Sequence, residues 1–305
     1  MFDVVIPTKN RPEDLHRLLD SIRASTVYPK RIVIIDQSEE KQTINPPNYN
    51  DTIEIVHIHD TAVSGLTAAK NLGISKCKSD IVFFFDDDII LDPDFFEIIM
   101  NHFKENPKIV GICGRQKNSK SSKFKLLAFN IFHFGEFKDE RKKYNSGLAK
   151  PGLYRTSILP GGITAYKRKL FTEYHFDEVL VKYCLGEDMD LSYRVGKKYK
   201  LAFATDATAL HNHSQIGRYD PIESYACKVA SYTYFYKKNV KKNAFNSFSY
   251  FMVILGIVAD ALAYSVKNKN LDAIRGLKKG KRYVKTDFRE TPFIDYERLT
   301  STRKK

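Results

Sequence analysis

Ile81-Val82-Phe83-Phe84-Phe85-Asp86-Asp87-Asp88-Ile89-Ile90 places five apolar residues directly before three carboxylates. A run so rich in β-branched and aromatic residues predicts a strand buried on both faces, as in the middle of a parallel sheet. Open α/β sheets bind ligands at the carboxyl ends of their strands, so the carboxylates predict a divalent cation that carries a phosphate. In an extended chain Asp86 and Asp88 point to one side and Asp87 to the other, so the first two can share one cation.

The segments before this strand predict a parallel unit of strand, helix and strand. Residues 3–7 and 31–35 are apolar strand-like runs, and an apolar stripe with helical period lies between them at Leu15, Leu18, Leu19 and Ile22. The first run leads into residues 8–11, and the second ends at Asp36. Because the carboxyl ends of parallel strands converge on one crevice, we expect both sites to lie near Asp86, Asp87 and Asp88.

Later segments alternate between ordered and irregular patterns. A helix is expected after Asp92-Pro93, which would cap it. Residues 115–152 lack periodicity and contain many basic side chains, which predicts a long, partly mobile insertion that faces a ligand. Gly161-Gly162 indicates either close approach of the backbone to a ligand or a plain tight turn. Gly186-Glu187-Asp188 opens a further helix, and residues 201–205 predict a strand that leads to His211.

The composition is that of a basic, folded protein. The formal net charge is +14, which indicates an acidic partner such as a phosphorylated substrate, an anionic membrane or nucleic acid. No helix-turn-helix, RRM or zinc-finger pattern occurs, and we therefore expect no nucleic-acid partner. Because the chain opens on an apolar run without signal-peptide features, we expect a cytoplasmic protein. The four cysteines form no C-x-x-C pair, so neither a zinc site nor a disulfide framework is predicted.

The last third of the chain differs from the rest. Residues 267–305 contain thirteen Lys and Arg but five Asp and Glu. Residues 248–266 are mostly apolar, but lysines flank both ends and Asp260 interrupts them, at a cost of about 2.5–3.5 kcal/mol in a bilayer centre. A single span would leave one basic cluster on the wrong side, so we expect a helix or shallow hairpin at an anionic membrane surface. A core or dimer-forming helix is the alternative.

Five motifs in a fixed order resemble family 2 glycosyltransferases of the GT-A fold, including rhamnosyltransferase-like members. They are Val5-Ile6-Pro7-Thr8-Lys9-Asn10-Arg11, Ile34-Ile35-Asp36-Gln37-Ser38, Ala69-Lys70-Asn71-Leu72-Gly73, Phe85-Asp86-Asp87-Asp88 with Pro93 beyond it, and Gly186-Glu187-Asp188. The resemblance covers about residues 3–213, and the order of the motifs makes it specific. It implies an α/β fold with a mostly parallel central sheet flanked by helices, a nucleotide-diphospho-sugar donor, and Mn²⁺ or Mg²⁺.

The resemblance also implies roles for individual residues. Asp36 would contact the nucleobase, Asp86 the ribose side and Asp88 the metal, with His211 as a second candidate ligand. Asp188 would be the general base that takes the proton of the acceptor hydroxyl while its oxygen attacks the anomeric carbon with inversion. The other donor contacts would be Pro7, Thr8, Asn10, Arg11, Lys70 and Asp87. The contacts to the acceptor or the donor sugar would be Gly161, Gly162 and Glu187.

Several of these residues also have a purely structural interpretation. Asp87 could only cap its turn, Asp36 could be an N-cap, and His211 could be a packed histidine. Acids at the start of a helix, such as Glu187 and Asp188, suit the helix dipole whatever else they do. Lys70 stands where many family members have Arg, which keeps the charge and loses the fork. The Q-x-x-R-W motif of processive members is absent, because the chain has no Trp, which favours single additions.

These patterns predict an inverting, metal-dependent enzyme that moves one sugar from a nucleotide-diphospho-sugar to a hydroxyl of a glycan or polyprenyl-linked acceptor. Residues 1–115 would form the nucleotide-sugar half and residues 116–215 the acceptor half of a GT-A domain. Residues 216–305 would form a helical, basic region on the inner face of the cell membrane. One alternative is a sugar-phosphate nucleotidylyltransferase, although residues 7–10 lack the glycine-rich loop expected of one. The other is a non-catalytic glycan-binding protein at the membrane surface.

Overall fold

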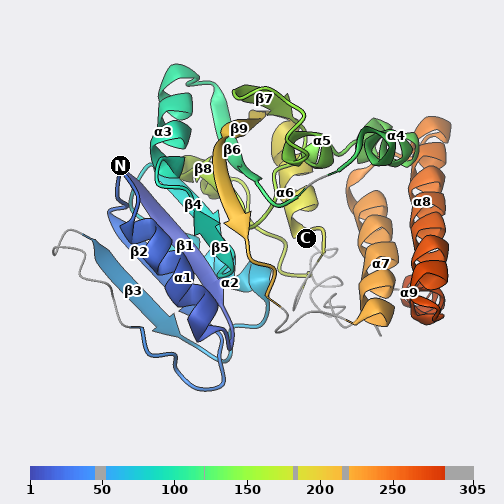
Figure 1. Cartoon of the computed structure of the whole chain (residues 1–305), viewed down its shortest axis with the longest axis horizontal. Coiled ribbons are helices and arrows are strands. Elements are labelled where there is room, and N and C mark those ends of the chain that lie inside the picture. The colour runs from blue at the N-terminus through green and yellow to red at the C-terminus, as the bar shows by residue number, and fades with distance from the viewer. Residues whose placement is uncertain (45–52, 120, 181–184, 215–219, 286–305) are drawn as a thin grey trace.

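A computed structural model of the chain describes residues 1–44, 53–119, 121–180, 185–214 and 220–285. It has one mixed sheet with helices on both faces and a group of long helices beside it (Figure 1). The strands are β1 (Phe2–Thr8), β2 (Arg31–Asp36), β3 (Glu54–His59), β4 (Ile81–Phe85), β5 (Ile89–Leu91), β6 (Ile109–Gln116), β7 (Leu153–Thr156), β8 (Ile163–Lys167) and β9 (Lys200–His211). The α-helices are α1 (Pro12–Arg23), α2 (Leu66–Lys76), α3 (Phe95–Glu105), α4 (Lys123–Phe132), α5 (Arg141–Asn145), α6 (Glu187–Gly196), α7 (Pro221–Asn239), α8 (Ala244–Asn268) and α9 (Asp272–Lys285). Two 3₁₀ turns are η1 (Gly135–Phe137) and η2 (Arg168–Thr172).

The strand order explains why the predicted site residues meet. The order is β3-β2-β1-β4-β8-β6-β9-β5, with β7 paired to β9. β3, β2, β1 and β4 are all parallel, as the sequence predicted for β1 and β2, so their carboxyl ends lie at one edge. β8 is antiparallel to both β4 and β6, and β6 is parallel to β9. The protein is therefore an α/β protein with a largely parallel first half.

Strand alternation divides the core into two layers. Phe83 and Phe85 of β4 pack with α1 and α3 on one face of the sheet, while Val82 and Phe84 face α2 and α6 on the other. All five residues of β4 are buried, which confirms the central strand that its apolar run predicted. Because both faces are covered by helices, the open edge at the strand ends is left for ligands.

The segment expected to be an irregular insertion contains more regular structure than the sequence indicated. The residues described between 115 and 152 include the end of β6, the helices α4 and α5 and the turn η1. No residue of α4 is buried. The helix therefore has no core-facing side, and its sequence lacks the amphipathic pattern that would have predicted it. The predicted cap at Asp92 is also wrong: α3 begins after Asp94, and the Asp92 carboxylate instead accepts hydrogen bonds from Lys117 and Thr208.

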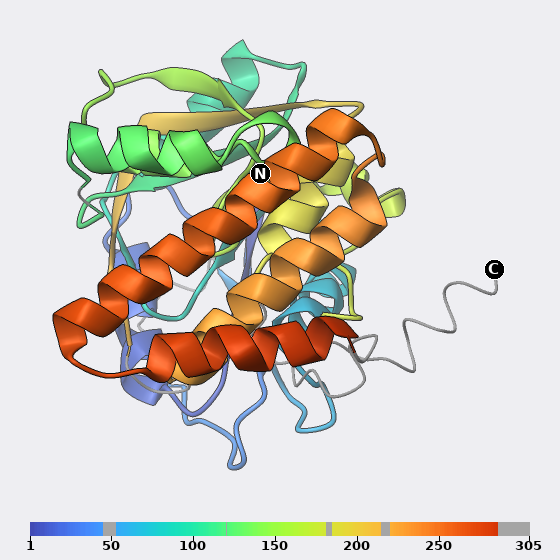
Figure 2. The same cartoon turned by 90° about the vertical axis from the view of Figure 1, so that its right-hand side faces the viewer.

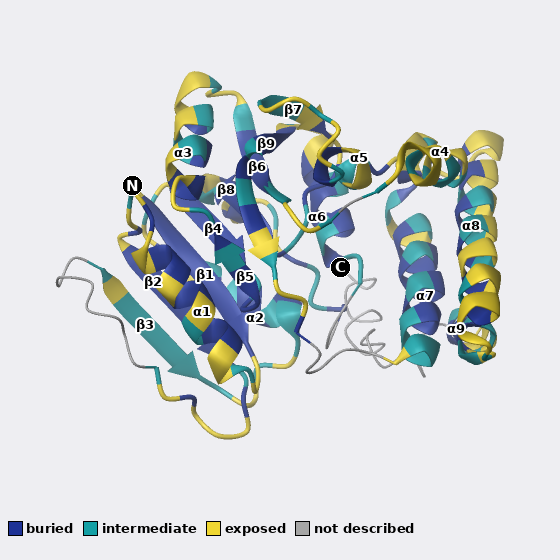
Figure 3. Ribbon diagram, in the orientation of Figure 1, coloured by how far each residue is buried: buried dark blue, intermediate teal, exposed yellow. Residues whose placement is uncertain are grey.

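The last three helices pack together beside the sheet (Figure 2). Gly276 and Gly280 of α9 lie against the backbone of α7, where an added Cβ would come within 2.5 Å of the Ile222 oxygen and 2.9 Å of the Ala226 oxygen. α8 buries a narrow stripe at Ser249, Val253, Ile257, Ala261 and Ser265. Much of its remaining surface is exposed (Figure 3). The predicted boundary at residue 215 and the basic residues after 285 lie outside the described residues.

Candidate active site

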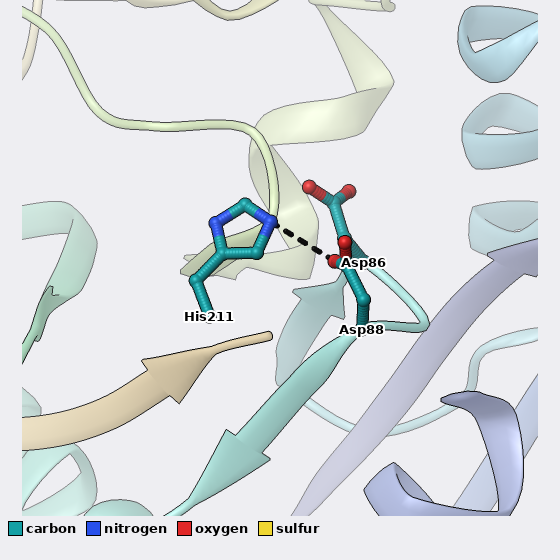
Figure 4. A group of neighbouring side chains, drawn as sticks. All are labelled: Asp86, Asp88 and His211. Carbon is teal, nitrogen blue, oxygen red and sulfur yellow. Dashed lines mark ion pairs between the residues drawn. The ribbon is translucent and has the colours of Figure 1, made fainter. Parts of the chain in front are cut away.

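The carboxylates after β4 form the centre of a three-residue cluster. One ligand atom from each of Asp86, Asp88 and His211 lies within 4.8 Å of the others (Figure 4). His211 ends β9, which pairs with β5 directly after the aspartates, and its Nε2 is 3.0 Å from Oδ1 of Asp88. Two carboxylates and an imidazole suit Mn²⁺ or a similar divalent ion. Asp86 and Asp88 lie close enough to share one cation, as their spacing suggested, although a turn rather than an extended chain brings them together. The resemblance had implied a ribose contact for Asp86.

Asp88 is held in its ionised form by its neighbours. Its Oδ2 accepts the backbone N–H of Ser214 at 2.9 Å. Burial acts to raise the pKa of Asp88, but the hydrogen bond and charge of His211 outweigh it, and the pKa lies below its usual value. The carboxylate is therefore available to a cation at neutral pH.

Asp87 turns away from this cluster and ties two strand ends together. Its carboxylate accepts hydrogen bonds from Oγ1 of Thr8 at 2.8 Å and from Nη1 of Arg11 at 3.0 Å. Burial raises its pKa to about 6, against the charge of Arg11. Thr8 and Arg11 belong to the first motif, so Asp87 fixes the loop after β1 next to the end of β4. The turn-holding interpretation of Asp87 fits these contacts.

Asp36 has a similar internal role in this structure. The side chain is fully buried, and its oxygens accept bonds from the backbone N–H groups of Ser38 and Gln42 at 3.0 and 2.9 Å and contact His57 at 3.2 Å. Burial acts to raise its pKa, but the hydrogen bonds outweigh it and lower the pKa. Asp36 therefore shapes the loop after β2, which holds Asn10 through the Oγ of Ser38.

The glycine pair packs against side chains of the site. A Cβ at Gly162 would lie 2.0 Å from Oδ2 of Asp86, and one at Gly161 would lie 2.3 Å from Oε1 of Glu187. Lys70 is fully buried and donates to the Gly161 oxygen and to Glu187, both at 3.1 Å. Burial raises the pKa of Glu187 to about 7 despite the charge of Lys70. The absence of side chains at both glycines is thus what lets Asp86 and Glu187 take these positions.

Asp188 begins α6 and contacts an arginine that the sequence patterns did not single out. Arg141, the first residue of α5, donates to Oδ2 of Asp188, while its Nε and Nη2 hold Asp139 at 2.8–3.0 Å. Oδ1 of Asp188 accepts the N–H of Met189 at 2.7 Å. Arg141 lies in a run of charged residues without helical period, so no signal distinguished it from a solvated side chain.

These groups line one large cavity of about 1420 Å³. All predicted site residues except Asp36 and Lys70 line it, so the structure brings together Pro7, Thr8, Asn10, Arg11, Asp86, Asp87, Asp88, Gly161, Gly162, Glu187, Asp188 and His211. The cavity also extends to residues of α4, α7 and α8 that were not predicted to line it. The Asp86–Asp88–His211 cluster and the candidate base Asp188 thus line the same cavity, as a group-transfer site requires.

The chain is similar in sequence to several known proteins. The chain is 27% identical to the O-antigen chain rhamnosyltransferase RfbN of Salmonella typhimurium over 70% of the chain and 67% of that protein. It is 21% identical to the poly(ribitol-phosphate) beta-N-acetylglucosaminyltransferase TarP of Staphylococcus aureus over 79% and 73%. Some other relatives match over only 36% or 42% of their own length.

A solved structure supports the fold. The mannosyltransferase PcManGT from Pyrobaculum calidifontis, in complex with GDP-Man and Mn²⁺, aligns with a TM-score of 0.59 at 14% identity, covering 92% of this chain and 86% of that one. The fold is therefore the GT-A fold that the motifs predicted. A family model described as glycosyl transferase family 2 matches residues 3–174, more than half of the chain. The protein belongs to glycosyl transferase family 2 and is a glycosyltransferase.

Proposed function

We propose that the protein transfers one sugar from a nucleotide-diphospho-sugar to an acceptor hydroxyl, with metal dependence and inversion of the anomeric centre. The observation that carries this proposal is the single cavity that contains both the Asp86–Asp88–His211 cluster and Asp188. Residues 1–115 supply the donor side, residues 116–215 supply the acceptor side, and residues 216–305 form an added helical region.

The donor binds along the strand ends. Pro7, Thr8, Asn10 and Arg11 line this part of the cavity, and the loop after β2, held by Asp36, borders it through Gln37. Asp86, Asp88 and His211 would hold Mn²⁺ or Mg²⁺, which when bound supplies positive charge to the leaving diphosphate. Arg11 adds a fixed cation to the same region.

Asp188 accepts the proton of the acceptor hydroxyl. A carboxylate oxygen can accept more than one hydrogen bond, so Oδ2 can receive a hydroxyl while Arg141 holds it. Arg141 and Asp139 thereby orient the base, and Glu187 with Lys70 fixes the first turn of the same helix. As the acceptor oxygen attacks the anomeric carbon, its proton passes to Asp188 and the diphosphate leaves from the opposite face.

The acceptor is a glycan or lipid-linked glycan used at the cytoplasmic face of the cell membrane. RfbN and TarP are described by their names as acting on O-antigen chains and poly(ribitol-phosphate), which supports a cell-envelope acceptor. Among the described residues α8 is the one helix long and apolar enough to cross a bilayer. Its exposed Phe248, Phe251 and Leu255 instead support attachment along the membrane surface.

The proposal is tested by transfer and donor hydrolysis over a panel of sugar nucleotides, with and without Mn²⁺. Turnover should appear with at least one donor, depend on the metal, and be lost in Asp88→Asn and Asp188→Asn. Asp94→Asn, an exposed aspartate outside the cavity, is the control and should leave turnover unchanged. Unchanged turnover and metal dependence in both site variants would show that the residues are assigned wrongly.

A further inference from the structure

The cavity has a second arm that none of the assigned donor groups occupies. Its walls come from α4, α7 and α8 and are mostly apolar. The apolar and aromatic wall residues are Phe124, Ala128, Phe129, Phe132, Tyr232, Gly256, Ile257, Ala259 and Ala263, and the polar ones are Lys125, Lys228, Ser231 and Asp260. A lining of this composition suits a hydrocarbon group.

A series of contacts joins this arm to Asp188. Arg141 contacts Asp188, and the next residue, Lys142, places its Nζ 3.8 Å from the ring centroid of Phe129. Farther along α4, Phe132 lies so close to α8 that a Cβ at Gly256 would be 2.7 Å from it. The arm therefore runs from the proposed base, past Lys142, into the space between α4 and α8.

The junction between the polar part and the arm is cationic. Lys125 and Lys142 line it, and within the described part of the chain neither is in an ion pair with a carboxylate. Lys228 also lines it, but its charge is offset by Asp260 at 3.2 Å. Arg141 is likewise offset by Asp139 and Asp188. Lys142 is also attracted by the more distant charges of Asp139 and Asp260, but it forms no direct ion pair with either, so Lys142 and Lys125 can still contact a phosphate in the cavity.

The helices that form the arm also carry exposed apolar side chains. Phe124, Leu127 and Ile131 of α4 are 78%, 62% and 54% exposed, and Leu262 and Val266 of α8 are 51% and 80% exposed. α4 and α8 contact each other (Figure 2), and the exposed apolar side chains of both helices suit the apolar layer of a membrane. The exposed apolar side chains of α4 and α8 thus lie on the same two helices that line the arm.

We propose that the arm between α4 and α8 binds the hydrocarbon chain of a lipid-phosphate acceptor, whose phosphate contacts Lys142 and Lys125. This inference rests on the proposed function, because it makes the arm the acceptor subsite of the same cavity. The lipid enters from the membrane side, the phosphate stays at the lysines, and the sugar hydroxyl beyond the phosphate reaches Asp188. The acceptor class is then an amphiphile rather than a free glycan.

Calorimetric titration of the full-length protein tests the subsite with farnesyl diphosphate as the probe. EDTA is present, so that no divalent ion can hold the diphosphate at Asp88. Farnesol, inorganic pyrophosphate and dihexanoyl phosphatidylglycerol are titrated in parallel, to separate the chain, the phosphate and an ordinary phospholipid. Lys142→Ala is compared with the exposed Lys143→Ala, and Ala263→Trp, which fills the arm, with Val266→Trp, which lies outside the cavity.

The wild type should bind farnesyl diphosphate at least about tenfold more tightly than each of the other three probes, because both chain and phosphate are recognised. Lys142→Ala and Ala263→Trp should each weaken it by about fivefold or more, and the two controls should not. Equal binding of pyrophosphate or phosphatidylglycerol, or unchanged affinity in Lys142→Ala and Ala263→Trp, would overturn the proposal. If Ala263→Trp does not fold, Ala259→Trp takes its place.

A separate titration keeps this result distinct from the proposed function. Nucleoside diphosphates with Mn²⁺ should bind equally well to the wild type and to Lys142→Ala. Metal-dependent nucleotide binding without farnesyl diphosphate binding would refute the lipid subsite and still support the proposed transferase function. Farnesyl diphosphate binding without metal-dependent nucleotide binding would instead refute the proposed transfer from a nucleotide-diphospho-sugar.

Discussion

Arg141 is the residue whose replacement most sharply tests how the base is held. Its guanidinium donates to Asp139 through Nε and Nη2 and to Asp188 through Nη1. Burial acts to lower the pKa of Arg141, but the charges of Asp139 and Asp188 raise it well above its usual value. Replacing Arg141 by Met would leave two carboxylates at 9% and 14% exposure without their cation.

The size of the effect follows from this geometry. Removing one partner of a fully buried ion pair costs about 3–5 kcal/mol. Because the Arg141 side chain is 24% exposed, we expect Arg141→Met to lower the free energy of unfolding by about 2–3 kcal/mol. Arg141→Lys keeps the charge but cannot reach both aspartates as a fork, so kcat should fall about 10- to 100-fold with a smaller change in KM.

Urea unfolding followed by circular dichroism and steady-state transfer assays measure the two effects. In a double-mutant cycle, Asp139→Asn should recover part of the stability lost in Arg141→Met, with a coupling energy of about 1 kcal/mol or more. A structural role alone would leave kcat of Arg141→Lys near the wild-type value. An Arg141→Met variant as stable and as active as the wild type would refute the reasoning.

Three further predictions follow from particular contacts. Burial raises the pKa of Glu187 from 4.5 to about 7. The stability of the wild type relative to Glu187→Gln should therefore be greatest below pH 4.5 and fall as the pH rises through 7. A difference in urea unfolding that does not change with pH would contradict this. Gly162→Ala places a Cβ 2.0 Å from Asp86, so metal-dependent turnover should be lost, whereas Gly196→Ala, whose Cβ meets nothing closer than 3.9 Å, should keep it. Equal turnover in both would argue against a role for Asp86. The double variant Phe251→Ser with Leu255→Ser should reduce flotation with anionic vesicles by about tenfold or more, and the exposed Leu148→Ser should not. Unchanged flotation of the double variant would contradict the proposal that α8 attaches to the membrane surface.

The strands and the polar ends of the first half were predictable because their signals are local. The apolar run of β4 and the alternation around it determine which side chains enter which layer, and parallel pairing then brings Thr8, Asp36 and Asp86 to one edge. The separation of Asp87 from Asp86 and Asp88 was also expected, but its cause differs: Asp87 and Asp88 form a turn, closed by the Ile89 N–H that donates to the Asp86 backbone oxygen at 3.2 Å, rather than an extended strand. The local sequence is therefore sufficient to predict these strands and the polar residues at their ends.

The acceptor side was less predictable because it depends on contacts between distant segments. No residue of α4 is buried, and the position of this helix in the cavity depends on the contact between its Phe132 and Gly256 of α8. The role of Arg141 depends on its contacts with Asp139 and Asp188, and no sequence pattern predicted these contacts. Asp36 was predicted to touch the nucleobase, and that stays a prediction, although its oxygens are occupied by Ser38, Gln42 and His57.

The central claim is that Asp86, Asp88 and His211 hold a divalent ion next to the donor diphosphate. A crystal structure of the protein with Mn²⁺ and the nucleoside diphosphate of its donor, recorded at the manganese absorption edge, tests this directly. We expect an anomalous peak within coordination distance of these three side chains and of a diphosphate oxygen. A bound nucleotide with no manganese at this cluster, or with manganese held elsewhere, would contradict it.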